Sequence, residues 1–84
     1  MLIGKRRGRL DVIEDILKVA DDPRGANKTR LVYRSNLNFN RLSAFLDFLL
    51  KKEFLEKNIE ENTYSLTAKG REFLRQLEKM QDLI

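Results

Sequence analysis

The chain has 84 residues, of which 42% are hydrophobic and 36% are charged, and its formal net charge at pH 7 is +4. This length suits one small domain with its own core. The sequence contains no cysteine and no histidine, which excludes disulfides and thiolate metal sites and removes the commonest general base and metal ligand. We therefore expect a protein that is not an enzyme, needs no cofactor, spans no membrane and is cytoplasmic.

Basic charge is concentrated in two parts of the chain. Residues 1–10 hold four basic and no acidic residues, and residues 23–52 hold seven basic residues against one acidic residue. Such segregation favours a polyanionic partner. The alternative is a solvated surface that happens to be basic.

The first predicted helix begins near Leu10, and its apolar residues recur with the period of a helix. They are Leu10, Ile13, Ile16, Leu17 and Ala20. Turn-forming residues at 21–25 then end this helix.

Three asparagines shape the next two helices. Asn27 is expected to cap a helix from Lys28 to about Ser35. Asn36 follows that helix, where a left-handed backbone would end it, and Asn38 is expected to cap a third helix that ends near residues 51–52. The apolar stripe of this third helix is Leu42, Phe45, Leu46, Leu49 and Leu50. So short a connection between two helices is the signature of a helix-turn-helix.

Residues 54–60 and 63–66 are short segments that predict a β-hairpin, with the turn at Glu61 and Asn62. Leu55, Ile59, Tyr64 and Leu66 are expected to share one face of it. Thr67 would then cap a last helix that runs to the end of the chain. The predicted fold is thus mainly α with a small β-hairpin: an N-terminal arm at 1–9, a domain at 10–66 and a C-terminal helix at 67–84.

Two stretches resemble the small archaeal winged helix-turn-helix proteins. They are KTRLVYRSNLNFNRLSAFLDFLLKKEFLEK at residues 28–57 and YSLTAKGREFL at residues 64–74. The resemblance implies a winged helix-turn-helix that binds DNA. In one chromatin-associated branch it also implies dimerisation through the last helix, as an antiparallel coiled coil.

The chain departs from that family in two places. Glu53 stands where the family usually has glycine, so we expect either a left-handed glutamate or a different helix end. The tip of the wing, residues 60–62, is short and acidic, whereas a wing that holds phosphates should be basic. We therefore expect the helices and the N-terminal arm, rather than the wing, to contact DNA.

The candidate DNA contacts fall into three groups: the arm, the second helix and the outer face of the third. The arm would follow the DNA backbone or enter a minor groove, the second helix would hold phosphates, and the third would lie in the major groove. The alternatives are a solubilising tail and ordinary polar helix surfaces. The candidates are Lys5, Arg6, Arg7, Arg9, Lys28, Thr29, Arg30, Arg34, Asn40, Arg41, Ser43 and Ala44.

The aromatic residues and the last helix supply the remaining predictions. Phe39, Phe45, Phe48 and Phe54 are assigned to the core rather than to a base-stacking surface, while Tyr33 is either partly exposed or packed on the third helix. Apolar residues at coiled-coil spacing predict a homodimer through the last helix. The expected interface residues are Leu74, Leu77, Met80, Leu83 and Ile84. The last four of these would leave an apolar strip in water in a monomer. The alternative is a helix folded fully on its own domain.

These observations predict a homodimer that binds double-stranded DNA, associated with the nucleoid, as a transcriptional regulator or a chromatin organiser. The second hypothesis is a winged-helix protein-interaction module, which the acidic wing favours, and the third is a structured-RNA binder. The sequence shows no candidate catalytic residue, metal site or small-molecule ligand.

Overall fold

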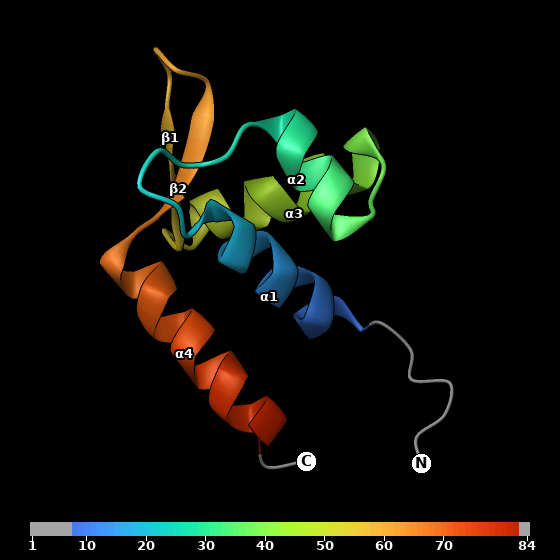
Figure 1. Cartoon of the computed structure of the whole chain (residues 1–84), viewed down its shortest axis with the longest axis vertical. Helices are drawn as coiled ribbons and strands as arrows, with labels where there is room; N and C mark the ends of the chain where they lie inside the picture. Colours follow the sequence, from blue (N-terminus) through green and yellow to red (C-terminus); the bar gives the residue numbers. More distant parts are fainter. Residues whose placement is uncertain (1–7, 83–84) are drawn as a thin grey trace.

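The computed structural model describes residues 8–82, and Figure 1 colours these residues along the chain. The order of elements is the predicted one, three helices followed by a hairpin and a last helix, and the mainly α fold class is confirmed. The elements are α1 (Arg9–Ala20), α2 (Lys28–Ser35), α3 (Phe39–Lys51), β1 (Leu55–Asn58), β2 (Thr63–Leu66) and α4 (Ala68–Asp82). Figure 1 shows α4 along one side of α1, with α2 on the other side.

The asparagines act as the sequence predicts. The side-chain oxygen of Asn27 accepts a 2.8 Å hydrogen bond from the main-chain nitrogen of Arg30, which caps α2. The side chain of Asn38 caps α3 in the same way, by accepting from the nitrogen of Arg41 at 2.8 Å. Asn36 lies between them with φ +57° and ψ +44°, the left-handed conformation that ends α2. Local side-chain chemistry therefore fixes the connection between the two helices.

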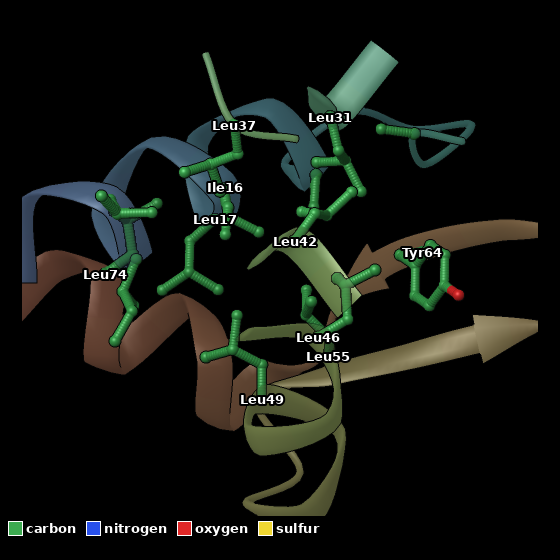
Figure 2. Packing of buried hydrophobic residues seen from close by; sticks show 14 of the residues in the cluster. Ile16, Leu17, Leu31, Leu37, Leu42, Leu46, Leu49, Leu55, Tyr64 and Leu74 are labelled. Carbon is green, nitrogen blue, oxygen red and sulfur yellow. The ribbon is translucent and has the colours of Figure 1, made fainter. Parts of the chain in front are cut away.

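The core is aliphatic and draws on every helix and both strands (Figure 2). Ile16 and Leu17 of α1 and Leu31 of α2 are fully buried. The stripe predicted for α3 is confirmed: Leu42, Leu46 and Leu49 are buried, and the flanking Phe45 and Leu50 are half-buried.

The hairpin pairs antiparallel from Leu55 opposite Leu66 to Asn58 opposite Thr63. Tyr64 also exchanges main-chain hydrogen bonds of 2.8 and 2.9 Å with Ala26, so the loop before α2 is tied to β2. The predicted first strand was too long at its C-terminal end. Ile59 lies in the loop and is 84% exposed, so its expected place on one face of the hairpin with Leu55, Tyr64 and Leu66 was wrong.

Helix α4 approaches the hairpin closely at Gly70. A Cβ atom on Gly70 would lie 1.9 Å from the carbonyl oxygen of Phe54, so only glycine fits at this point. Further along α4, the ring of Phe73 stacks on that of Phe54, with centroids 4.4 Å apart and planes 11° from parallel. The base of the hairpin and the first turns of α4 therefore form one packed unit.

Several apolar residues lie where the periodicity alone did not place them. Phe39 and Phe48 are 54% and 42% exposed, so their assignment to the core was wrong, whereas Phe45 and Phe54 are half-buried as expected. Their exposed fractions place Phe39 and Phe48 at the margins of the apolar stripe of α3. Tyr33 is exposed on α2, so of its two predicted positions the exposed one is correct and it does not pack on α3.

The apolar face of α4 packs inward further than expected. Leu77 is only 4% exposed and, like Leu74, belongs to the core of its own domain. The expectation that Leu77 would lie in water in a monomer was therefore wrong. Met80 is 51% exposed, and the two remaining interface candidates, Leu83 and Ile84, lie outside the described residues.

Candidate nucleic-acid interface

The outer face of α3 carries the polar residues that the sequence assigned to base contact. Asn40, Arg41 and Ala44 are exposed, and Ser43 is half-buried. Within residues 8–82 the side chains of Asn40 and Arg41 make no hydrogen bond or ion pair. Their polar groups are therefore available to an external partner, from the first turn of a helix that the Asn38 cap holds in place.

The basic residues of α2 are also exposed. Lys28, Thr29, Arg30 and Arg34 all present their side chains to solvent. Because α2 contacts α3, the structure brings the α2 candidates and the α3 candidates to adjacent helices. Lys5, Arg6 and Arg7 of the predicted arm lie outside the described residues. Arg9 lies in the first turn of α1 rather than in an extended arm.

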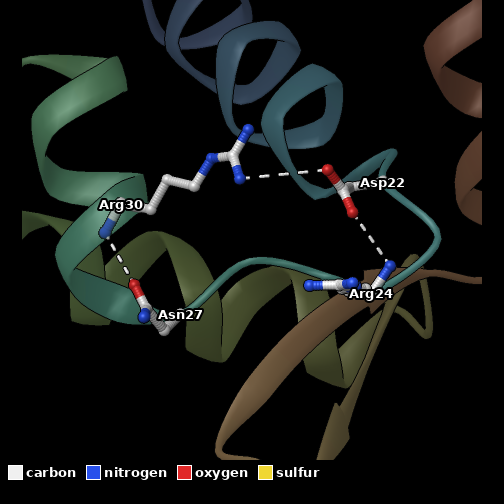
Figure 3. A network of polar contacts seen from close by, with 4 residues as sticks. All are labelled: Asp22, Arg24, Asn27 and Arg30. Carbon is white, nitrogen blue, oxygen red and sulfur yellow. Dashed lines mark hydrogen bonds and ion pairs between the residues drawn. The ribbon is translucent and has the colours of Figure 1, made fainter.

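Arg30 is partly held by a polar network at the start of α2 (Figure 3). Its guanidinium lies 3.9 Å from a carboxylate oxygen of Asp22, whose other oxygen accepts a 2.9 Å hydrogen bond from the main-chain nitrogen of Arg24. Both partners of the ion pair are partly exposed, so it contributes little to stability. Arg30 can therefore exchange Asp22 for a phosphate at small cost.

Arg24 is a candidate that the sequence analysis missed. It is exposed, and it lines a hollow of about 410 Å³ together with Arg30 and the wing residues Glu61 and Thr63. Its position in the basic segment 23–52 was the available signal. Turn residues around Arg24 suggested only a loop, and only the fold brings that loop next to the wing.

The wing itself remains acidic at its tip. Glu60 and Glu61 are both exposed in the loop between β1 and β2. Since Glu61 lines the same hollow as Arg24 and Arg30, it lowers the positive potential there. The arrangement favours phosphate contact at α2 and α3 over contact at the wing tip.

Residues 8–82 contain no group of three or more acidic side chains arranged to hold a metal ion. None of their helices has the length and apolarity that crossing a membrane requires.

Comparison with known proteins gives a consistent result. A family model described as winged helix-turn-helix matches residues 6–84. The crystal structure of Sso10a-2, a DNA-binding protein from Sulfolobus solfataricus, superposes with a TM-score of 0.79 at 25% identity, over 92% of this chain and 81% of that one.

Two curated relatives come from Methanocaldococcus jannaschii. The uncharacterized protein MJ0290 is 30% identical over 94% of this chain and 36% of its own length. The uncharacterized protein MJ0287 is 29% identical over 94% of this chain and 78% of its own length. The chain thus spans about a third of the first relative and most of the second.

Proposed function

Because the chain belongs to the winged helix-turn-helix family, we propose that it is a non-enzymatic protein that binds double-stranded DNA at the nucleoid. The single observation that carries this proposal is the outer surface of α2 and α3. There the exposed Lys28, Arg30, Arg34 and Arg41 lie on two adjacent helices, and the only acidic residue of either helix is Asp47. The similar fold of Sso10a-2, a DNA-binding protein, supports the same function.

In this proposal α3 is the recognition helix. Its 13 residues span about 20 Å, and the major groove admits a single helix. Asn40 and Arg41 in its first turn would meet base edges, adenine and guanine respectively, and the small Ser43 and Ala44 would allow close approach. Lys28, Thr29, Arg30 and Arg34 of α2 would hold phosphates.

We also propose that the protein acts as a homodimer, as a transcriptional regulator or a chromatin organiser. A two-fold pair would place two α3 helices at a fixed spacing along one duplex. The support within the described residues is Met80, which leaves apolar surface in water near the end of α4.

The test is the affinity for a random DNA duplex measured across a salt series. Neutralised phosphates release counterions, so affinity should fall steeply as salt rises. Arg30→Ala should weaken binding to every sequence and lower the salt slope by roughly one unit. Lys79→Ala is the matched control, since Lys79 is an exposed cation on α4, on the far side of α1 from α2, and should leave both quantities unchanged.

Arg41→Ala distinguishes base contact from phosphate contact. If Arg41 meets a guanine, its loss should cost about 1–3 kcal/mol on a preferred site and less on random DNA. Unchanged affinity in both the Arg30 and the Arg41 variants would overturn this interface. A chain that has no duplex affinity at any salt concentration would favour a protein-interaction module, the function that the exposed Glu60 and Glu61 support.

A further inference from the structure

An apolar groove lies between α1 and α3, at the edge of the core. Leu10 and Ile13 of α1 and Phe45 and Phe48 of α3 line it, and its volume is about 480 Å³. Leu10 is 48% exposed and Phe48 is 42% exposed, although most residues of these types are covered in folded domains. The volume falls in the range of small-molecule sites, which are mostly apolar with a few polar groups.

Two arginines supply the polar groups of this groove. Arg9 and Arg41 line it together with the apolar residues, and its lining includes no acidic residue. Neither arginine has an ion-pair partner within the part of the chain that the structure describes. A guanidinium presents a planar fork of donors that matches a carboxylate. The combination of apolar walls and unpaired guanidinium groups suits a ligand with an apolar body and one anionic group.

We propose that the groove between α1 and α3 binds a small amphipathic carboxylate, with its hydrocarbon part against Leu10 and Phe48 and its carboxylate against Arg9 and Arg41. Covering Leu10 and Phe48 removes apolar surface from water. The two cations select an anionic head over a neutral one.

The same site is placed to control DNA binding, a step that rests on the proposed function. Arg41 and Ala44 line the groove and also belong to the outer face of α3. A carboxylate bound to Arg41 neutralises it and occupies the space beside Ala44. Ligand and duplex therefore compete, and the ligand lowers DNA affinity.

The binding step is tested without DNA, on the full chain. The fluorescent anion 8-anilinonaphthalene-1-sulfonate reports occupancy of the groove, and octanoate and 1-octanol are then compared as competitors. They share one hydrocarbon chain and differ in the charged head. We expect octanoate to displace the fluorescent anion saturably. Octanol should bind about tenfold more weakly than octanoate, because it lacks the one charge-assisted hydrogen bond that the carboxylate makes.

Two matched pairs of variants locate the site. Arg41→Gln should weaken octanoate binding about tenfold and leave octanol unchanged, whereas Arg34→Gln removes the same charge from an exposed position on α2 and should change neither. Phe48→Ser should weaken both competitors. Ile59→Ser replaces an exposed apolar residue of the wing loop and should change neither. Thermal melts show whether each variant is folded.

Several results would overturn the proposal. Absence of displacement by octanoate would mean that the groove is closed by the chain itself or holds no such ligand. If Arg41→Gln and Arg34→Gln weaken octanoate binding equally, the binding is non-specific attraction of an anion to a basic protein. An affinity that falls as protein concentration rises would show that a second copy covers the groove. Duplex affinity that saturating octanoate leaves unchanged would overturn the competition alone, even if the protein binds DNA as proposed.

Discussion

The hydroxyl of Thr67 donates a 2.6 Å hydrogen bond to the main-chain carbonyl oxygen of Glu53, which lies 14 residues earlier. The same hydroxyl oxygen accepts a 2.9 Å hydrogen bond from the main-chain nitrogen of Gly70. One side chain thus caps α4 and ties its first turn to Glu53, the second residue after α3. The two strands of the wing leave from this junction, so Thr67 fixes the wing and α4 relative to α3.

Thr67→Val should therefore destabilise the domain. Valine keeps the shape of threonine but loses the cap and the bond to Glu53, and we expect a loss of about 1–3 kcal/mol in the free energy of unfolding. Thr67→Ser keeps the hydroxyl and should lose less. Urea denaturation measures both, and equal losses in the two variants would show that the hydroxyl contributes little.

At Glu53, in contrast, we expect a substitution that stabilises the domain. The backbone of Glu53 is left-handed, with φ +65°. The main-chain nitrogen of Glu53 donates a 3.0 Å hydrogen bond to the carbonyl oxygen of Leu50, and that of Phe54 donates a 2.9 Å hydrogen bond to the carbonyl oxygen of Leu49. This is the Schellman arrangement, in which the left-handed residue is usually glycine. Of the two alternatives that the sequence left open for Glu53, the left-handed glutamate is therefore the one that the structure has.

Glu53→Gly should stabilise the domain by about 1 kcal/mol, because a side chain in the left-handed region costs about that much. Glu56→Gly is the control, since Glu56 lies in β1 with its side chain exposed and glycine weakens a strand. The control should lower the melting temperature and Glu53→Gly should raise it. A lower melting temperature for both would mean that Glu53 makes a compensating interaction.

The two asparagines at the start of α3 separate stability from binding. Asn38→Ala removes the helix cap and should cost about 0.5–2 kcal/mol of stability. Asn40→Ala removes an exposed side chain and should change stability by less than roughly 0.5 kcal/mol while weakening DNA binding. Thermal melts and duplex titrations of both variants check this, and the reverse pattern would contradict the assignment of the two roles.

Those features that depend on local chemistry could be predicted from the sequence. Asn27 and Asn38 each accept a hydrogen bond from a main-chain nitrogen three residues away, and Asn36 ends α2 through its own left-handed backbone. The short connection between α2 and α3 could therefore be predicted from these residues. Residues governed by tertiary packing could not be predicted in this way. Gly70 is an example, because its closeness to Phe54 depends on how the hairpin packs on α4.

In the candidate site, too, local features could be predicted from the sequence and features that depend on tertiary packing could not. Helical periodicity identified the outer face of α3, but it could not show that Phe48 lies at the margin of its apolar stripe with Arg9 and Leu10 nearby. That groove joins residues from two helices far apart in sequence. Periodicity also could not tell whether Leu77 faces its own core or a partner, because both produce the same spacing.

A pH dependence is expected from Lys18, whose ammonium lies 3.1 Å from the buried carboxylate of Glu14. The hydrogen bond with Glu14 raises the pKa of Lys18 above its usual value of 10.5, against the smaller opposing effect of desolvation. The charged lysine therefore stabilises the fold below the usual pKa, and this contribution is lost as pH rises through the raised pKa.

Lys18→Met keeps the aliphatic stem and removes the charge. Because Lys18 is half exposed, we expect a loss of only about 0.5–1 kcal/mol at neutral pH. The difference between wild type and variant should disappear under strongly alkaline conditions. Urea denaturation at both pH values measures it. A difference that persists in alkali would assign the loss to packing instead of charge.

The last prediction concerns assembly through α4. Leu74 and Leu77 face the core, whereas Met80 is 51% exposed one turn further on. Exposed apolar surface at the end of a helix favours a partner, and two copies of α4 can supply it to each other. Sedimentation of the wild-type chain should then give a mass near twice 9.9 kDa.

Met80→Glu should produce a folded monomer with weaker DNA affinity, because a charge in the shared interface opposes association while the domain core is untouched. Leu77→Glu is the contrasting variant. Leu77 is 4% exposed, so a carboxylate there would be buried without a partner and should unfold the domain itself. A wild-type chain that stays monomeric at high micromolar concentration would rule out the homodimer, and DNA binding would then rest on a single α3.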